Sequence, residues 1–199
     1  MRQGSYSNSK EEVELFFRNL ESEFKLKFSK KYDVKFYWHT VNQKLNPVKK
    51  EYFLMIPKFI NYQGEGLFNA SLIHYNFYFG SLAGKKEIGV TLEIQYPTIE
   101  QNKLAHELLI NSNPALEEIE KKVFSKKGED SKTGQKRFAF YHTLSSNFFD
   151  ILKSDDPKNK KQLILEWYLK NIDYLLELTY YDLEKNKLNL QKIALMNKK

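Results

Sequence analysis

One short stretch of the sequence, Lys86 to Tyr96, places a carboxylate and an amide side by side. Apolar and polar residues alternate there, which is the pattern of a β-strand with one buried face. Glu93 and Gln95 are two residues apart, so on a strand both side chains lie on the polar face, next to each other. We expect this polar face to be available to a ligand, with Glu93 and Gln95 as the candidate catalytic residues if the protein is an enzyme.

The segment Val90-Thr-Leu-Glu93-Ile-Gln95 resembles the end of the metal-site motif of the PD-(D/E)XK endonucleases. In that family a strand ends in Glu-x-Lys, or in Glu-x-Gln in some restriction enzymes. The resemblance implies that two carboxylates hold Mg²⁺ and that the third residue positions the attacking water. The family's first acid precedes this strand, but residues 70–84 contain no acid. The remaining candidates for the first acid are Glu87, on the same strand, and the more distant Glu65 and Asp33.

The chain is basic, with a net charge of +7 and a pI of about 9.2. Such a charge favours partners with phosphate backbones. The candidate nucleic-acid-binding residues cluster in one region: Lys121, Lys122, Lys126, Lys127, Lys132, Lys136 and Arg137. Three aromatic residues, Tyr75, Tyr78 and Tyr141, could stack on bases beside them if they are exposed. The alternative is an ordinary solvated lysine surface with these aromatics buried in the core.

Other chemistries find little support in the sequence. The absence of Cys excludes disulfides and thiolate metal sites, and it fits a cytoplasmic protein. The four His residues fall on different predicted elements, without a spacing that places two metal ligands together: His39, His74, His106 and His142. Neither a nucleophile elbow nor a phosphate-binding glycine motif occurs. We expect no membrane span, because no apolar run reaches about 18 residues, and no secretory signal, because the N-terminal stretch is charged.

The periodicity of apolar residues predicts the elements that position these groups. Helices are expected over residues 9–27, 98–111 and 113–124, in a long helix capped by Asp156-Pro157, and over residues 182–196. Strands are expected over residues 33–41, 52–56, 70–80, 86–96 and 136–142. Two capping boxes, Ser9 with Glu12 and Thr98 with Gln101, predict where two of the helices begin. The apolar face of the long helix is expected to be Leu163, Ile164, Trp167, Ile172, Leu175 and Leu176.

A run of strands followed by helices predicts an α+β fold with an antiparallel sheet of about five strands and helices packed on one face. At 199 residues the chain is expected to form a single domain. Within it, residues 1–8 are expected to be a loose tail and residues 125–135 a polar surface loop.

The order of elements resembles an uncharacterised bacterial domain family found beside restriction-nuclease-like modules. The residues that carry the resemblance are Phe16-Phe17, Val90 to Ile94, Leu116 to Glu120, Lys136-Arg137-Phe138 and Trp167. It implies a context of nucleic acid and phage defence, and it assigns no catalytic residue. We expect a non-enzymatic, nucleic-acid-interacting protein without a cofactor. Two alternatives stay open: a Mg²⁺-dependent endonuclease, and a protein–protein or inhibitor module that docks through an aromatic-rich surface.

Overall fold

The structure, a computed structural model, describes residues 5–40, 51–60, 73–82, 85–117, 136–144, 148–153 and 160–196. For some of these residues, including Lys136, Arg137 and Tyr141, it describes the backbone alone. The helices and strands are α1 (Ser5–Phe28), β1 (Val34–Thr40), β2 (Glu51–Pro57), β3 (Ile73–Leu82), β4 (Lys85–Ile94), α2 (Ile99–Ser112), β5 (Lys136–Thr143), α4 (Phe148–Lys153), α5 (Lys160–Lys185) and α6 (Lys187–Leu195). The predicted α+β fold is confirmed.

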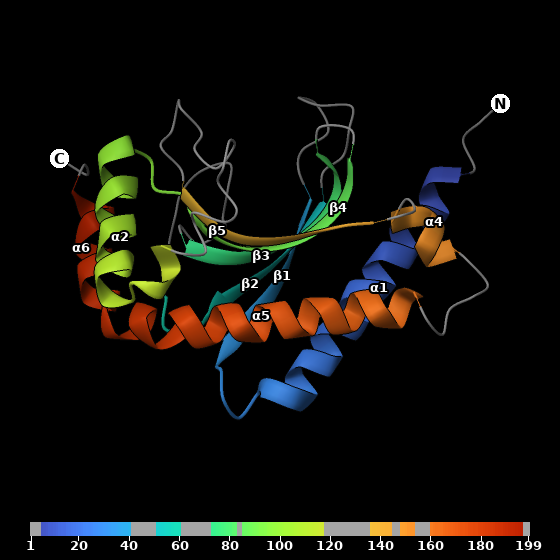
Figure 1. The fold of residues 1–199 in the computed structure, drawn as a ribbon, viewed down its shortest axis with the longest axis horizontal. Helices are drawn as coiled ribbons and strands as arrows, with labels where there is room; N and C mark the ends of the chain where they lie inside the picture. Colours follow the sequence, from blue (N-terminus) through green and yellow to red (C-terminus); the bar gives the residue numbers. More distant parts are fainter. Residues whose placement is uncertain are drawn as a thin grey trace.

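The five strands form one antiparallel sheet in the order β1-β2-β3-β4-β5 (Figure 1). The longest pairing joins β3 to β4, from Ile73 opposite Ile94 to Leu82 opposite Lys85. Each strand pairs with its neighbours in the chain, so β1 and β5 are the two edges of this sheet among the described strands.

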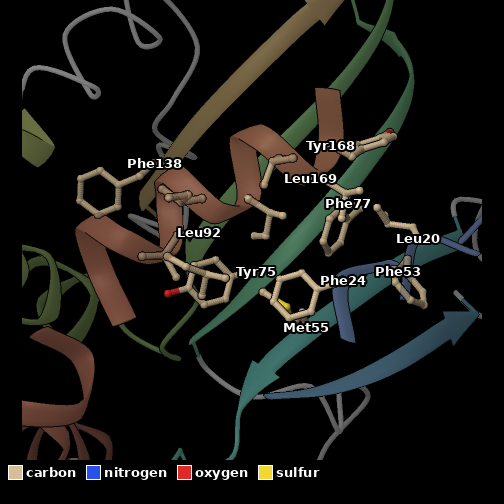
Figure 2. Close-up of a cluster of buried hydrophobic side chains, with 14 of the residues drawn as sticks. Leu20, Phe24, Phe53, Met55, Tyr75, Phe77, Leu92, Phe138, Tyr168 and Leu169 are labelled. Atoms are coloured by element: carbon tan, nitrogen blue, oxygen red, sulfur yellow. The ribbon is translucent and has the colours of Figure 1, made fainter. Parts of the chain in front are cut away.

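The register places apolar side chains in rows across one face of the sheet. Met55 pairs with Tyr75, Tyr75 with Leu92, and Leu92 with Phe138, and all four side chains are fully buried. Figure 2 shows this row together with Leu20 and Phe24 of α1 and with Tyr168 and Leu169 of α5. The predicted alternation of the strand around Leu92 is therefore confirmed on its apolar side, where the strand meets the helices.

The helices lie on this apolar face and at its ends (Figure 1). Phe17 of α1 stacks on Phe53 of β2 at 5.2 Å between ring centroids, and Phe16 meets Phe148 of α4 at 5.5 Å. At one end of the sheet α2 and α6 lie side by side, where the Gln101 side-chain amide donates to the backbone oxygen of Ile193 at 2.8 Å. These contacts link both ends of the chain to the core.

Tyrosine hydroxyls fasten the helices to the strands. The Tyr75 hydroxyl of β3 lies 2.6 Å from the Thr179 hydroxyl of α5, and the Tyr168 hydroxyl donates to the backbone oxygen of Tyr78 at 2.7 Å. Both tyrosines are fully buried. Burial raises the pKa of both hydroxyls, because it disfavours the charged phenolate. Their neutral, hydrogen-bonded form is therefore part of the folded state.

Local signals predicted some helix ends correctly and others wrongly. The Thr98 capping box is confirmed. The Thr98 side chain accepts from the backbone N–H of Gln101, and the Gln101 side chain accepts from the backbone N–H of Thr98. The box at Ser9 is wrong: α1 begins at Ser5, so Ser9 lies inside the helix and residues 5–8 are not a loose tail. The start predicted at residue 182 is also wrong, since α5 runs on to Lys185.

Several predicted segments lie outside the described residues. These are the 125–135 loop, the Asp156-Pro157 cap, and the part of the 113–124 helix beyond Glu117. The short helix α4 is not predicted by the sequence, although its residues Phe148, Ile151 and Leu152 are buried in the core. Leu163 is placed wrongly on the apolar face of α5, because 62% of its surface is exposed.

Candidate functional site

Polar side chains gather on the opposite face of the sheet, around Glu93 on β4. The register places His74 directly opposite Glu93, and Asn76 directly opposite Thr91. On the other side of β4, Arg137 of β5 is the residue that pairs with Glu93. The two central strands therefore bring His74, Asn76, Thr91 and Glu93 together, which we call the Glu93 cluster, with Gln95 next along β4.

The Glu93 carboxylate accepts hydrogen bonds at both of its oxygens. Oε1 accepts from the Thr91 hydroxyl at 3.1 Å and from the Asn76 amide at 3.4 Å. Oε2 accepts from the Gln95 amide and lies 3.7 Å from His74 Nε2. Hydrogen bonds of this kind offset the desolvation of a buried carboxylate. The pairing of Glu93 with Gln95, inferred from their spacing, is therefore present as a direct contact.

The expected open polar face is wrong for the central strands. Glu93 is 5% exposed, His74 3% and Thr91 1%, so these side chains are as buried as much of the apolar core. Alternation along β4 correctly separates apolar from polar side chains, but it does not show whether the polar side faces water. A ligand would have to reach Glu93 through a buried environment.

The Glu93 cluster fits a Mg²⁺ site poorly. Mg²⁺ prefers an octahedral shell of oxygen ligands, usually including carboxylates. Within the described part of the chain, no group of three His, Asp or Glu side chains could hold a metal ion. Both Glu93 oxygens also have protein donors, and the Gln95 amide is used in one of these bonds. Only the Asn76 Oδ1 atom is buried without a hydrogen-bond partner among the residues of this cluster that the structure describes.

Most of the predicted phosphate-binding residues lie outside the described part of the chain. The residues that lie outside the described ranges are Lys121, Lys122, Lys126, Lys127 and Lys132. Lys136 and Arg137 are the first two residues of β5, where the backbone alone is described. The lysine-rich segment, residues 121–137, thus ends in the first two residues of an edge strand. Most of the chain's excess of basic over acidic residues lies outside the described ranges.

Aromatic side chains meet between this edge strand and α5. Phe140 contacts Tyr174 at 5.7 Å between ring centroids, and His142 contacts Trp167 at 5.8 Å. Tyr174 is 49% exposed, His142 is also exposed, and Phe140 and Trp167 are partly buried. Together with the exposed Lys170 on α5, these residues form what we call the β5–α5 surface.

Of the three aromatics that the sequence offered for stacking, Tyr75 is wrong. Tyr75 is fully buried, with its hydroxyl bonded to Thr179, and so it is not exposed to a ligand. Tyr78 is partly buried, and the side chain of Tyr141 lies outside the described atoms. The predicted strand over residues 136–142 contains Phe140 and His142, and the predicted long helix contains Trp167. Only the contact between β5 and α5 shows that they meet at the surface.

The chain has no match among protein-family models, curated proteins or solved structures. In the part of the chain that the structure describes, no helix is long and apolar enough to cross a membrane. Any proposal about function therefore depends on the residues and contacts described above.

Proposed function

We propose that this protein is a non-enzymatic nucleic-acid-binding module. The observation that carries the proposal is the β5–α5 surface, in which exposed and partly exposed aromatic rings follow the edge strand that the lysine-rich segment enters. Lysines beside exposed rings combine the two contacts that nucleic-acid-binding grooves use, namely ionic contacts to phosphates and stacking on bases.

Charge supports the proposal further. The net charge of +7 attracts polyanions at a distance, and in this proposal Lys121, Lys122, Lys126, Lys127, Lys132, Lys136 and Arg137 contact phosphates. A nucleic acid held by these residues then meets the folded core at the β5–α5 surface.

The Glu93 cluster favours binding over cleavage. Its single carboxylate is buried and already accepts hydrogen bonds at both oxygens, which leaves little capacity for a metal and its water. The resemblance to domains found beside restriction-nuclease-like modules supports a restriction or phage-defence context for the binding. The endonuclease and the protein–protein module stay as alternatives for the experiment to separate.

The test is the affinity of the purified protein for labelled duplex DNA, single-stranded DNA and RNA, measured by fluorescence anisotropy between about 50 and 200 mM salt. Replacing Lys126, Lys127, Lys132 and Lys136 with Gln removes four positive charges. Each lysine that no longer binds a phosphate reduces the slope of log affinity against log salt by about 0.7–0.9. We expect weaker binding by this variant and a slope that is smaller by about 3 if all four lysines bind phosphates.

A matched control removes four lysines at the opposite side of the sheet: Lys27, Lys30, Lys35 and Lys58. Both variants change the net charge equally, so equal weakening would mean that charge alone drives binding. Absence of salt-dependent binding to all three nucleic acids would overturn the proposal and favour the protein–protein alternative. Cleavage that requires Mg²⁺ would instead favour the endonuclease, and Glu93→Ala would then be expected to abolish it.

A further inference from the structure

The outward side of the first half of α5 carries exposed apolar side chains. Residues 163, 167, 170 and 174 follow one another at spacings of three or four, which places them on one side of the helix. Leu163 is 62% exposed and Tyr174 49%. The fully buried Ile172 and Leu176 lie on the other side of α5, against the core. Exposed aromatic and aliphatic side chains gathered in this way mark a binding surface.

Two of the rings on α5 are held in place by rings of β5. Trp167 contacts His142 with an angle of 34° between the ring planes, and Tyr174 contacts Phe140 at 52°. Trp167 also packs edge-on against the buried Tyr168 at 5.6 Å. These contacts restrict the rings before any ligand binds, so less conformational entropy is lost on binding. Tyr181 differs, because its ring contacts Tyr180 on its own helix and, among the described side chains, no ring of β5.

We propose that the β5–α5 surface binds single-stranded nucleic acid, with unpaired bases stacked on Trp167 and Tyr174. This inference rests on the proposed function and names the form of nucleic acid that the surface takes.

The spacing of the rings supports an unpaired strand. Trp167 and Tyr174 are seven residues apart on a helix, which corresponds to about 10.5 Å along its axis. Phe140 and His142 are two residues apart on a strand, which corresponds to about 6.8 Å. Bases in a duplex follow each other every 3.4 Å or so along one strand. Bases that reach successive rings at these larger spacings must leave the stack of their neighbours, and only an unpaired strand does so at low cost.

The β5 edge and Lys170 of α5 fit the same ligand. β5 pairs with β4 on one side, and on its other side no described strand uses its backbone amides, which can donate to phosphate oxygens. Lys170 lies between Trp167 and Tyr174 in the outward row of α5. The helix also carries five acids against four lysines. Two of these acids, Asp173 and Glu177, are paired with Lys31 at 3.4 and 2.7 Å, which offsets part of their repulsion of phosphates.

The decisive measurement compares a labelled oligothymidine of about 12 nucleotides with a duplex of the same length, for the wild type and two variants. Tyr174→Leu keeps an apolar side chain but removes the stacking face. Tyr181→Leu makes the same change on the same helix, at a similarly exposed position that no described β5 ring contacts. We expect Tyr174→Leu to weaken oligothymidine binding about 5- to 150-fold, and Tyr181→Leu to leave it within about 2-fold of the wild type.

The outcomes separate this inference from the proposed function. Wild-type affinity for oligothymidine that is no higher than for the duplex, or equal effects of the two Leu variants, would overturn the single-strand inference while leaving nucleic-acid binding intact. If the wild type binds no nucleic acid, both this inference and the proposed function are overturned. Circular dichroism of each variant checks that it folds, and the wild-type comparison of single strand with duplex tests the inference without any variant. Binding of a protein but of no oligonucleotide at the β5–α5 surface would also overturn the single-strand inference.

Discussion

The hydrogen bond between Tyr75 and Thr179 joins the middle of the sheet to the longest helix, and its direction can be worked out. Thr179 Oγ1 lies 2.6 Å from the backbone oxygen of Leu175 and donates its one proton there. The Tyr75 hydroxyl, also at 2.6 Å, must then be the donor to Thr179. Both side chains are fully buried, so neither can turn to water instead.

This direction makes the two single substitutions unequal. Thr179→Val keeps the shape but leaves the Tyr75 hydroxyl buried without its acceptor, which costs about 1–3 kcal/mol of unfolding free energy. Tyr75→Phe removes the donor, while Thr179 keeps its own bond to Leu175, so the cost is about 0.5–1.5 kcal/mol. In the double variant neither hydroxyl is present, so none is buried without a hydrogen-bond partner. We therefore expect its stability to be close to that of Tyr75→Phe alone, so the coupling equals the cost of Thr179→Val, about 1–3 kcal/mol.

Urea denaturation followed by circular dichroism measures the four free energies of this cycle. Thr179→Ser is the control, because it keeps the hydroxyl and removes only a methyl group, at a cost of about 1 kcal/mol. Stabilities of Tyr75→Phe and Thr179→Val that simply add in the double variant would refute the assigned hydrogen bond. A Tyr75→Phe variant less stable than Thr179→Val would refute its direction.

The other predictions concern packing, capping, pH and the Glu93 cluster, each measured by urea denaturation. Phe17→Ala should cost about 3–5 kcal/mol, because the ring is fully buried among other aromatics; Leu15→Ala, on the same helix but 69% exposed, should stay within about 0.5 kcal/mol of the wild type. Thr98→Ala should cost about 1 kcal/mol through loss of the capping box, and an unchanged midpoint would contradict that role. Burial raises the pKa of Tyr32 to about 12 from about 10 in the unfolded chain, so its contribution to stability should be complete below pH 10 and lost as the pH rises towards 12; Phe at this position should make that alkaline decline shallower. Glu93→Gln should cost about 1.5–3 kcal/mol, because an amide group replaces an oxygen that accepts a hydrogen bond, and a neutral result would show that the buried carboxylate is not structural.

The parts of the fold that the sequence predicted well depend on neighbouring residues. Alternation along β4 requires only the residues of one strand, and the Thr98 box only four consecutive residues, so both could be inferred from the sequence alone. The Ser9 box has the same pattern as the Thr98 box, yet α1 begins earlier. A capping motif allows a helix to begin at a residue but does not prevent the preceding residues from joining the helix.

Other features were missed because they depend on contacts between distant segments. Leu163 fits the apolar spacing of α5, but the sequence does not say how wide a face the sheet covers. Glu93 looks like a surface residue until the burial of its whole strand face is known. The β5–α5 surface needs Phe140 and Tyr174 to meet across a separation of 34 residues in the sequence, and no local pattern predicts that contact.

The helical layer is built from the two ends of the chain, and this has a consequence for the protein during its synthesis. Phe16 of α1 packs against Phe148 of α4 and Tyr168 of α5, which leave the ribosome more than a hundred residues later. At common translation rates that interval is on the order of ten seconds. During it the apolar side of α1 can be covered only by itself, by early strands such as β2 through Phe53, or by a chaperone. The apolar side of α1 therefore waits for this whole interval before α4 and α5 can cover it.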